Sequence, residues 1–384
     1  MSAGTPHRYA ADYVSPRRLV ALGGVLVHFT SFTMATSHLV YFGTYTKSGS
    51  SRGIHVARLD DETGELSAPT IVAEAVDPAW ITLTPDKRFL YAIHGWRAQA
   101  IGFAVEPTRG TLTPLPAPES PAANPPSHLA VDATGRVLLA ANYRDGYVAS
   151  MAIHADGTLD APQIIRHEGR GTHPTRQEKP HVHSVTVSPD NRHVVVCDLG
   201  LDQIFTYELG VTQAKLAPAN PPFVATAPGA GPRHFKFSPD AAHAYAINEL
   251  ANTIVAYDYD ATRGALTPRQ TVSSLPPDFT GENTTAEIRV HPNGRYLYGS
   301  NRGHDSIAVY GIAATGELSL SEIVPSGGRT PRNFALSPNG RWLVCGHQDT
   351  PLITVFRVDP ATGRLARTPH TAPIGACVCV LFYD

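Results

Sequence analysis

A short sequence motif built on Pro-Asp or Pro-Asn recurs at intervals of about fifty residues and constrains the fold of this chain more than any other feature. Copies lie at residues 84–88, 188–192, 238–240, 291–295 and 337–341, with a degenerate copy at 132–136. Six residues after the Pro of each motif, or after Ala133 in the degenerate one, lies an apolar residue at the centre of a strand-like run. A similar run around Tyr41 makes the seventh. These residues are Tyr41, Tyr91, Leu139, Val195, Tyr245, Tyr298 and Val344, at intervals of 50, 48, 56, 50, 53 and 46 residues.

A second sequence motif, typical of β-hairpins, recurs with the same period. Its glycines are Gly64, Gly110, Gly157, Gly264, Gly316 and Gly363, with Ala214 in a weak seventh copy. Glycine supplies the positive φ that tight hairpins need. Apolar residues alternate with period two around these turns, whereas no segment sustains a helical period. Four strands fit one repeat, so the sequence predicts an all-β protein, a seven-bladed β-propeller.

The two ends of the chain predict how the ring closes. Residues 39–46 match the second strand of a repeat, so the first copy lacks its innermost strand. An unpartnered strand-like run at 376–382 ends the chain. We therefore expect the closing blade to be shared between the N- and C-termini.

Composition excludes several classes of function. The formal net charge is −2 and no run of Lys or Arg occurs, so nucleic acid is not an expected partner. The four cysteines have no CxxC spacing and are expected to be reduced core thiols rather than metal ligands or disulfides. No segment after the first 35 residues has the roughly 20 apolar residues of a membrane span, so no membrane partner is expected either.

Residues 1–35 contain no element of the repeat. Arg17 and Arg18 precede an apolar run at 19–29, and small residues follow near Ala35, as in a secretory signal. Met34 offers the alternative of a misassigned start. We expect an N-terminal extension over 1–35 and the propeller over 36–384. The expected location is cytoplasmic, or periplasmic if the extension is a signal.

Aligned repeats place polar residues at one mouth of the propeller channel. The start of each inner strand and the end of the next strand meet there because the two run antiparallel. Imidazole, guanidinium and carboxylate groups from different blades predict a small-molecule site. Some of the polar residues at strand ends are expected to stabilise the local turn by hydrogen bonds to nearby backbone rather than to bind a ligand. These are Asn142, Asp198, Asn248 and Asn301. Arg233 and Glu249 are expected to pair, since they lie sixteen residues apart on adjacent strands.

Several of these segments are recognisable together. Residues 180–184, 198–202, 231–234, 248–250, 286–288 and 300–306 resemble the seven-bladed lactonase family, which includes propeller-type 6-phosphogluconolactonases and a carboxy-muconate lactonising enzyme. The resemblance covers about residues 39–382. It implies hydrolysis of 6-phosphogluconolactone to 6-phosphogluconate in the pentose phosphate pathway. The family's site residues correspond to His183, Arg233, Glu249 and Arg302 as catalytic residues, and we expect His181, His234, Glu287 and Arg332 to bind substrate.

The chemistry fits these residue types. Lactone hydrolysis needs a base for water and a cation for the developing oxyanion, which a neutral histidine and arginines supply. An arginine also binds phosphate through two parallel hydrogen bonds. A sugar-acid lactone is thus the expected partner, and neither a metal nor another cofactor is needed. Two alternatives stay open: an isomerase that lactonises a muconate-type diacid, and a non-enzymatic propeller that binds a protein.

Overall fold

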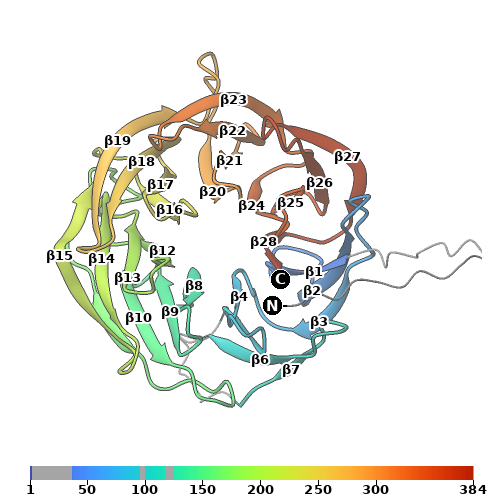
Figure 1. Cartoon of the computed structure of the whole chain (residues 1–384), viewed down its shortest axis with the longest axis horizontal. Coiled ribbons are helices and arrows are strands. Elements are labelled where there is room, and N and C mark those ends of the chain that lie inside the picture. Colours follow the sequence, from blue (N-terminus) through green and yellow to red (C-terminus); the bar gives the residue numbers. More distant parts are fainter. Residues whose placement is uncertain (2–36, 96–99, 117–123, 384) are drawn as a thin grey trace, which may run out of the picture. The chain divides into compact units, whose positions relative to one another are not determined.

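Seven four-stranded antiparallel sheets are arranged in a ring around a central channel (Figure 1). The computed structural model describes residue 1 and residues 37–95, 100–116 and 124–383. No helix occurs in these described segments, and so none that could cross a membrane. The predicted all-β, seven-bladed propeller is therefore confirmed, whereas the predicted N-terminal extension lies outside the described residues.

The blades are numbered in chain order, each from its inner to its outer strand. Blade 1 comprises β28 (Cys377–Phe382), β1 (Ser37–Thr44), β2 (Gly53–Asp60) and β3 (Thr70–Glu74). Blade 2 comprises β4 (Ile81–Leu83), β5 (Phe89–Ala92), β6 (Ile101–Val105) and β7 (Leu112–Pro114). Blade 3 comprises β8 (His128–Val131), β9 (Val137–Asn142), β10 (Tyr147–Ala152) and β11 (Gln163–Arg166).

The remaining blades continue this order. Blade 4 comprises β12 (Val182–Val187), β13 (His193–Asp198), β14 (Gln203–Gly210) and β15 (Lys215–Ala225). Blade 5 comprises β16 (Pro232–Phe237), β17 (His243–Asn248), β18 (Thr253–Asp260) and β19 (Ala265–Ser273). Blade 6 comprises β20 (Thr284–Val290), β21 (Tyr296–Arg302), β22 (Ser306–Ile312) and β23 (Leu318–Pro325). Blade 7 comprises β24 (Pro331–Leu336), β25 (Trp342–His347), β26 (Ile353–Val358) and β27 (Leu365–Ala372).

Blade 1 closes the ring with strands from both ends of the described propeller. Strand β28 pairs antiparallel with β1, with Val40 opposite Phe382 and Tyr41 opposite Leu381. In Figure 1 these strands, one red and one blue, lie together in the same blade. The predicted shared blade is thus confirmed, and its pairing joins the ring non-covalently.

The two repeated sequence motifs meet at the interfaces between blades. In four blades the repeat tyrosine donates a hydrogen bond to the carbonyl of the hairpin glycine in the next blade. The four bonds are Tyr41 to Gly110 (2.9 Å), Tyr91 to Gly157 (2.8 Å), Tyr245 to Gly316 (3.0 Å) and Tyr298 to Gly363 (2.8 Å). All four glycines have positive φ, between 72° and 84°. The two motifs therefore share one period because the same contact joins them in each of these four pairs of blades.

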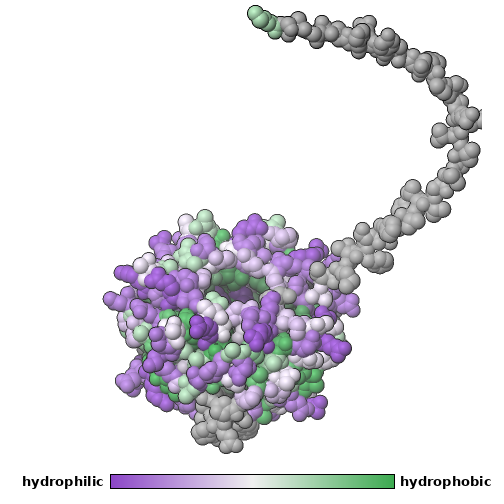
Figure 2. Space-filling model, turned by 60° about the horizontal axis from the view of Figure 1, so that its bottom comes forward, coloured by the Kyte–Doolittle hydropathy of each residue, from purple (hydrophilic) through white to green (hydrophobic). Residues whose placement is uncertain are grey.

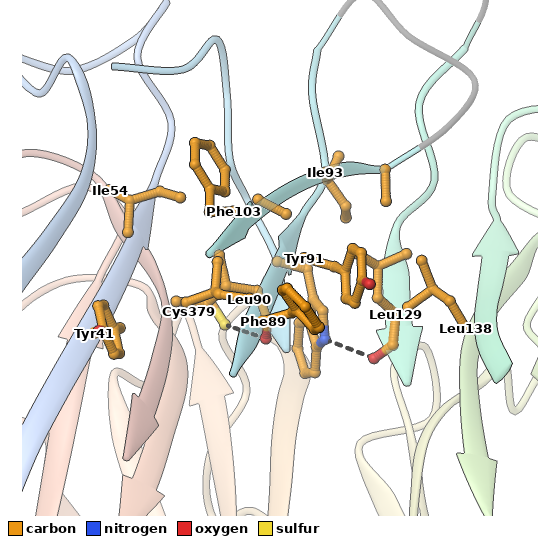
Figure 3. Packing of buried hydrophobic residues seen from close by; sticks show 14 of the residues in the cluster. Tyr41, Ile54, Phe89, Leu90, Tyr91, Ile93, Phe103, Leu129, Leu138 and Cys379 are labelled. Carbon is orange, nitrogen blue, oxygen red and sulfur yellow. Dashed lines mark hydrogen bonds between the residues drawn. The ribbon is translucent and has the colours of Figure 1, made fainter. Parts of the chain in front are cut away.

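Buried apolar side chains fill the spaces between blades. Figure 3 shows Leu90 and Tyr91 of β5 among residues of both neighbouring blades, such as Tyr41 and Leu129. All four cysteines are buried and unpaired, as predicted for core thiols. Because apolar clusters like this one hold neighbouring blades together, the strand ends at the channel mouth are set on a packed scaffold.

Candidate active site

A cavity of about 650 Å³ opens at one mouth of the channel, a size typical of small-molecule sites. Figure 2 shows the propeller hollowed at the centre of the ring on the face it displays. Most of the polar lining comes from blades 3 to 7, chiefly from the starts of inner strands and the ends of second strands, and Lys47 and Asp77 add charged groups from the side of blade 1. Lining residues include Tyr45, Trp80, Ser127, Tyr143, Arg176, His183, Arg233, His234, Glu249, Arg302, Arg332 and Asn333.

Three of these residues occupy β-bulges at the start of inner strands. The register between the first two strands shifts between Val182 and Ser184, between Pro232 and His234, and between Pro331 and Asn333. In each case the residue without a partner is a lining residue: His183, Arg233 or Arg332. A bulge bends its strand and redirects the extra side chain. A β-bulge at the same position in three blades thus directs a histidine and two arginines into the cavity.

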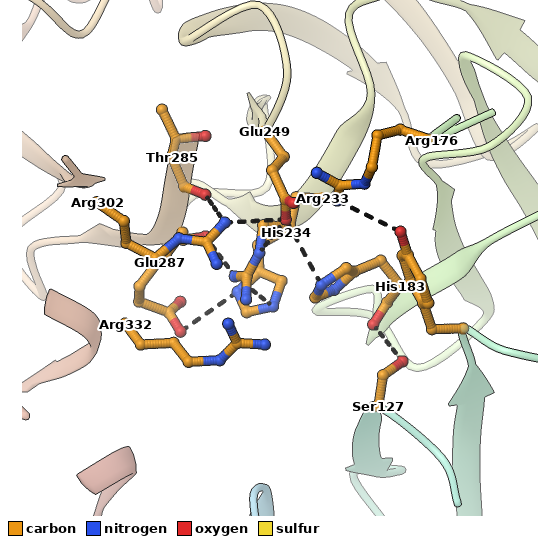
Figure 4. Close-up of polar contacts among 12 residues, drawn as sticks. Ser127, Arg176, His183, Arg233, His234, Glu249, Thr285, Glu287, Arg302 and Arg332 are labelled. Carbon is orange, nitrogen blue, oxygen red and sulfur yellow. Dashed lines mark hydrogen bonds and ion pairs between the residues drawn. The ribbon is translucent and has the colours of Figure 1, made fainter. Parts of the chain in front are cut away.

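Glu249 is the centre of the polar network (Figure 4). Its Oε2 lies 2.9 Å from Arg233 Nε and 3.1 Å from Arg302 Nη2, and its Oε1 lies 2.5 Å from Arg176 Nη2. Two of these arginines also donate to backbone carbonyls: Arg233 Nη1 to Ala286 at 2.6 Å and Arg302 Nη2 to Thr285 at 2.7 Å. The expected pairing of Arg233 with Glu249 is confirmed.

The surrounding cations keep Glu249 ionised. Burial alone would raise the pKa of Glu249, but Arg302 and Arg233 outweigh burial and hold that pKa well below the usual range. Burial, together with Arg302 and Arg332, lowers the pKa of Arg233 to about 9. Arg233 therefore stays charged at neutral pH, and the network holds one carboxylate against several guanidinium groups.

His183 is a buried, neutral imidazole beside this network. Its Nε2 lies 3.9 Å from Glu249 Oε2, and its Nδ1 has no hydrogen-bond partner among the described residues. Burial lowers the pKa of His183 well below 6.5, and Arg233 and His234 lower it further, although Glu249 opposes them. A histidine with a free nitrogen and a low pKa is unprotonated at pH 7 and can accept a proton.

Six of the eight residues singled out from sequence line the cavity, and two lie behind it. Glu287 is fully buried, with its Oε2 3.3 Å from His234 Nδ1 and hydrogen-bonded to Asn333. His181 stacks on Tyr143, with ring centroids 4.3 Å apart. Each of the two packs against a side chain that lines the cavity and is not itself part of the cavity wall, so a role in binding substrate stays a prediction for both.

Arg176 contacts Glu249 but is absent from the sequence-based set. It lies between β11 and β12, outside the two strand positions that the repeat alignment compares. The one signal was the spacing: the longest interval, 56 residues from Leu139 to Val195, spans this segment. An insertion in a repeat often lies on the binding face.

No group of three His, Cys, Asp or Glu side chains that could hold a metal ion occurs in the described part of the chain. What the arrangement offers is a neutral imidazole, an ionised carboxylate and several cations at one end of a cavity. Such a set can activate water and stabilise a developing oxyanion.

Comparison with known proteins places this site in a family. The family model "Lactonase, 7-bladed beta-propeller" matches residues 39–382. A 6-phosphogluconolactonase of Bacillus subtilis is 37% identical over 90% of this chain and 99% of its own, and one of an Enterobacter species is 30% identical over 84% and 92%. The structure of a periplasmic gluconolactonase of Pseudomonas aeruginosa superimposes with a TM-score of 0.85 and 32% identity over 90% of this chain and 99% of that one. The chain therefore belongs to the seven-bladed β-propeller lactonases.

Proposed function

We propose that this protein hydrolyses 6-phosphogluconolactone to 6-phosphogluconate. The observation that carries the proposal is the charge of the cavity wall. Six cationic side chains, Lys47, Arg144, Arg176, Arg233, Arg302 and Arg332, line the cavity against two carboxylates, Asp77 and Glu249. The whole chain has a formal net charge of −2, so the positive potential is local to the site. A wall of this kind favours an anionic substrate such as a phosphorylated sugar lactone.

In the proposed mechanism His183 takes a proton from water as that water attacks the lactone carbonyl carbon. The carbonyl oxygen becomes an oxyanion, and the Arg233 guanidinium, which borders the cavity beside His183, donates to it. Glu249 stays ionised and holds Arg233 and Arg302 in place through its Oε2. Collapse of the tetrahedral intermediate breaks the ring C–O bond, and the proton on His183 passes to the leaving alkoxide oxygen, which becomes a hydroxyl; the carboxylic acid that forms then releases its proton to solvent.

The test is a proton-release assay with freshly generated 6-phosphogluconolactone, compared with the spontaneous rate. We expect release well above that rate for the wild-type protein, and loss of the excess in His183→Ala. A wild-type rate equal to spontaneous hydrolysis would overturn the proposal. Gluconolactone is run in parallel, because a similar structure belongs to a gluconolactonase; a preference for that lactone would place this chain with the unphosphorylated substrate.

We propose a cytoplasmic location, since a phosphorylated sugar lactone does not cross membranes freely. The intact mass of the native protein decides the question. A chain that begins at Met34 supports the cytoplasm. An exported chain that begins near Ala35 or Thr36 would instead show that the preceding residues are a secretory signal. In either case we propose that residues 36–384 carry the full activity.

A further inference from the structure

Arg176 differs from the other arginines around Glu249 in exposure. Its side chain is 35% exposed, whereas those of Arg302 and Arg233 are 12% and 3% exposed. It therefore lies at the rim of the cavity, where a ligand can reach it without entering the deepest part. Figure 4 shows its guanidinium reaching Glu249 from the side of His183, opposite to Arg302.

The backbone that carries Arg176 is firmly held. The adjacent Gln177 is fully buried, and its Nε2 donates to Leu199 O at 2.8 Å and to Asp202 Oδ1 at 2.6 Å. Its Oε1 accepts from the backbone N–H groups of Thr172 (3.0 Å) and His173 (2.8 Å). These four bonds fix the start of the Arg176 side chain over the rim.

The guanidinium itself is less constrained than its neighbours. Its hydrogen bonds go to two other side chains, Glu249 Oε1 at 2.5 Å and Tyr143 OH at 3.4 Å. Arg233 and Arg302, by contrast, each donate to a backbone carbonyl that cannot move with a side chain. Arg176 can thus exchange its partner while its backbone stays in place, and the other two arginines cannot do so as readily.

The two ends of a phosphorylated sugar lactone are best placed in different surroundings. Its carbonyl must reach His183 and Arg233 deep in the cavity, while its dianionic phosphoryl group is best placed where it keeps part of its hydration. Phosphate accepts two parallel hydrogen bonds from an arginine and carries more charge than a carboxylate. It can therefore compete with Glu249 for the guanidinium at the rim.

We propose that Arg176 is the residue that selects the phosphorylated substrate, by exchanging Glu249 Oε1 for the substrate's phosphoryl oxygens. This inference rests on the proposed lactonase function. Glu249 keeps Arg233 and Arg302 on its Oε2 during the exchange. Its Oε1 is released and becomes an acceptor for a sugar hydroxyl, so the phosphoryl group also helps to orient the ring.

The experiment compares kcat/KM for 6-phosphogluconolactone and for gluconolactone in Arg176→Ala. We expect the ratio of the two values to fall by about 50-fold, mostly through KM for the phosphorylated lactone. Arg176→Lys keeps the charge without the paired hydrogen bonds and should recover part of the ratio. Arg170→Ala is the matched control: Arg170 is exposed on the same segment and does not line the cavity, so the ratio should not change.

Two results would overturn the proposal. An equal fall of kcat/KM for both lactones would mean that Arg176 only positions Glu249, and unchanged kcat/KM values for both lactones would place the phosphoryl group elsewhere, for example at Arg332. The thermal midpoint of each variant shows whether the fold is retained, and Arg176→Gln serves if Arg176→Ala is unstable. A wild-type protein inactive on both lactones would instead refute the proposed function itself.

Discussion

In blades 5 and 6, two consecutive residues at the end of the second strand serve opposite purposes. At the end of β21, Asn301 is fully buried: its Nδ2 donates to Ser274 O at 2.8 Å and to Ser306 Oγ at 3.1 Å. The next residue, Arg302, lines the cavity and binds Glu249. The pair Asn248 and Glu249 at the end of β17 repeats the pattern, with Asn248 bonded to Thr253 and Glu249 in the cavity.

The first residue of the pair has the same local role in blades 3 and 4. In blade 3 the second residue, Tyr143, lines the cavity, whereas in blade 4 the second residue, Leu199, is buried and does not. Asn142 donates to Asn124 O at 2.9 Å and accepts from the Asp145 backbone N–H, and Asp198 accepts from the backbone N–H groups of His181 and Gly200. The expected strand-end role of these residues is confirmed. Polarity at a strand end is therefore not by itself a sign of function in this fold: in blades 5 and 6 the first residue of the pair stabilises local structure and the second lines the cavity.

The largest effect that this comparison predicts is for Glu249→Gln. Loss of the carboxylate charge leaves Arg233, Arg302 and Arg176 without their common partner, so their placement for the oxyanion and substrate is lost. We expect kcat/KM for the lactone to fall by about 10³-fold. Asn248→Ala, one residue earlier, is the matched control and should change kcat/KM of the folded protein by less than about threefold. Equal losses in both variants would contradict the division of roles.

The pair at the end of β21 should separate activity from stability. Arg302→Ala is expected to lower kcat/KM by about 100-fold, because a cation at the site is lost. Asn301→Ala is expected to lower the free energy of unfolding by about 2–3 kcal/mol, because the buried polar groups of Ser274 and Ser306 lose their hydrogen bonds to Asn301. Urea titration and steady-state kinetics on both variants measure the two effects. If Asn301→Ala is fully folded and yet as inactive as Arg302→Ala, the proposed separation of activity from stability is wrong.

Arg332→Ala should have a smaller effect, chiefly on KM. Arg332 lines the cavity, and among the described residues its hydrogen bond is to Gln348 Oε1 at 3.4 Å rather than to a carboxylate. Its charge is therefore available to an anionic substrate, and its loss removes binding that is common to ground and transition states. We expect KM to rise about tenfold with kcat little changed. A fall in kcat alone would assign Arg332 to the chemical step instead.

The smallest predicted effect is on pH dependence. Neutral His183 is the active form, and burial followed by Arg233, His234 and Arg332 lowers its pKa below 6.5, so the acid limb of kcat/KM should lie well below that pH. Removing the positive charge of Arg332 raises the pKa of His183. The limb in Arg332→Ala should then move up by roughly half a pH unit. A limb that moves down, or stays in place, would exclude His183 as the titrating base.

Much of this arrangement could be predicted from the repeat. Equivalent positions in each copy located Arg233, Glu249 and Arg302 without coordinates, because the antiparallel order of inner and second strands is the same in every blade. Two kinds of feature could not be predicted. The bulge at His183 breaks the period-two alternation, so His181 and His183 do not share a wall although they lie two residues apart. Arg176 comes from an insertion whose path depends on the buried contacts of Gln177.

The most direct test of the proposed site is the rate of the double variant His183→Ala, Glu249→Gln on freshly generated 6-phosphogluconolactone. We predict that the wild-type protein exceeds the spontaneous rate and that the double variant falls to it, with a folded propeller shown by the same far-ultraviolet circular dichroism. A folded double variant that keeps the wild-type kcat would contradict the assignment of the site, even though the fold and the family would stand.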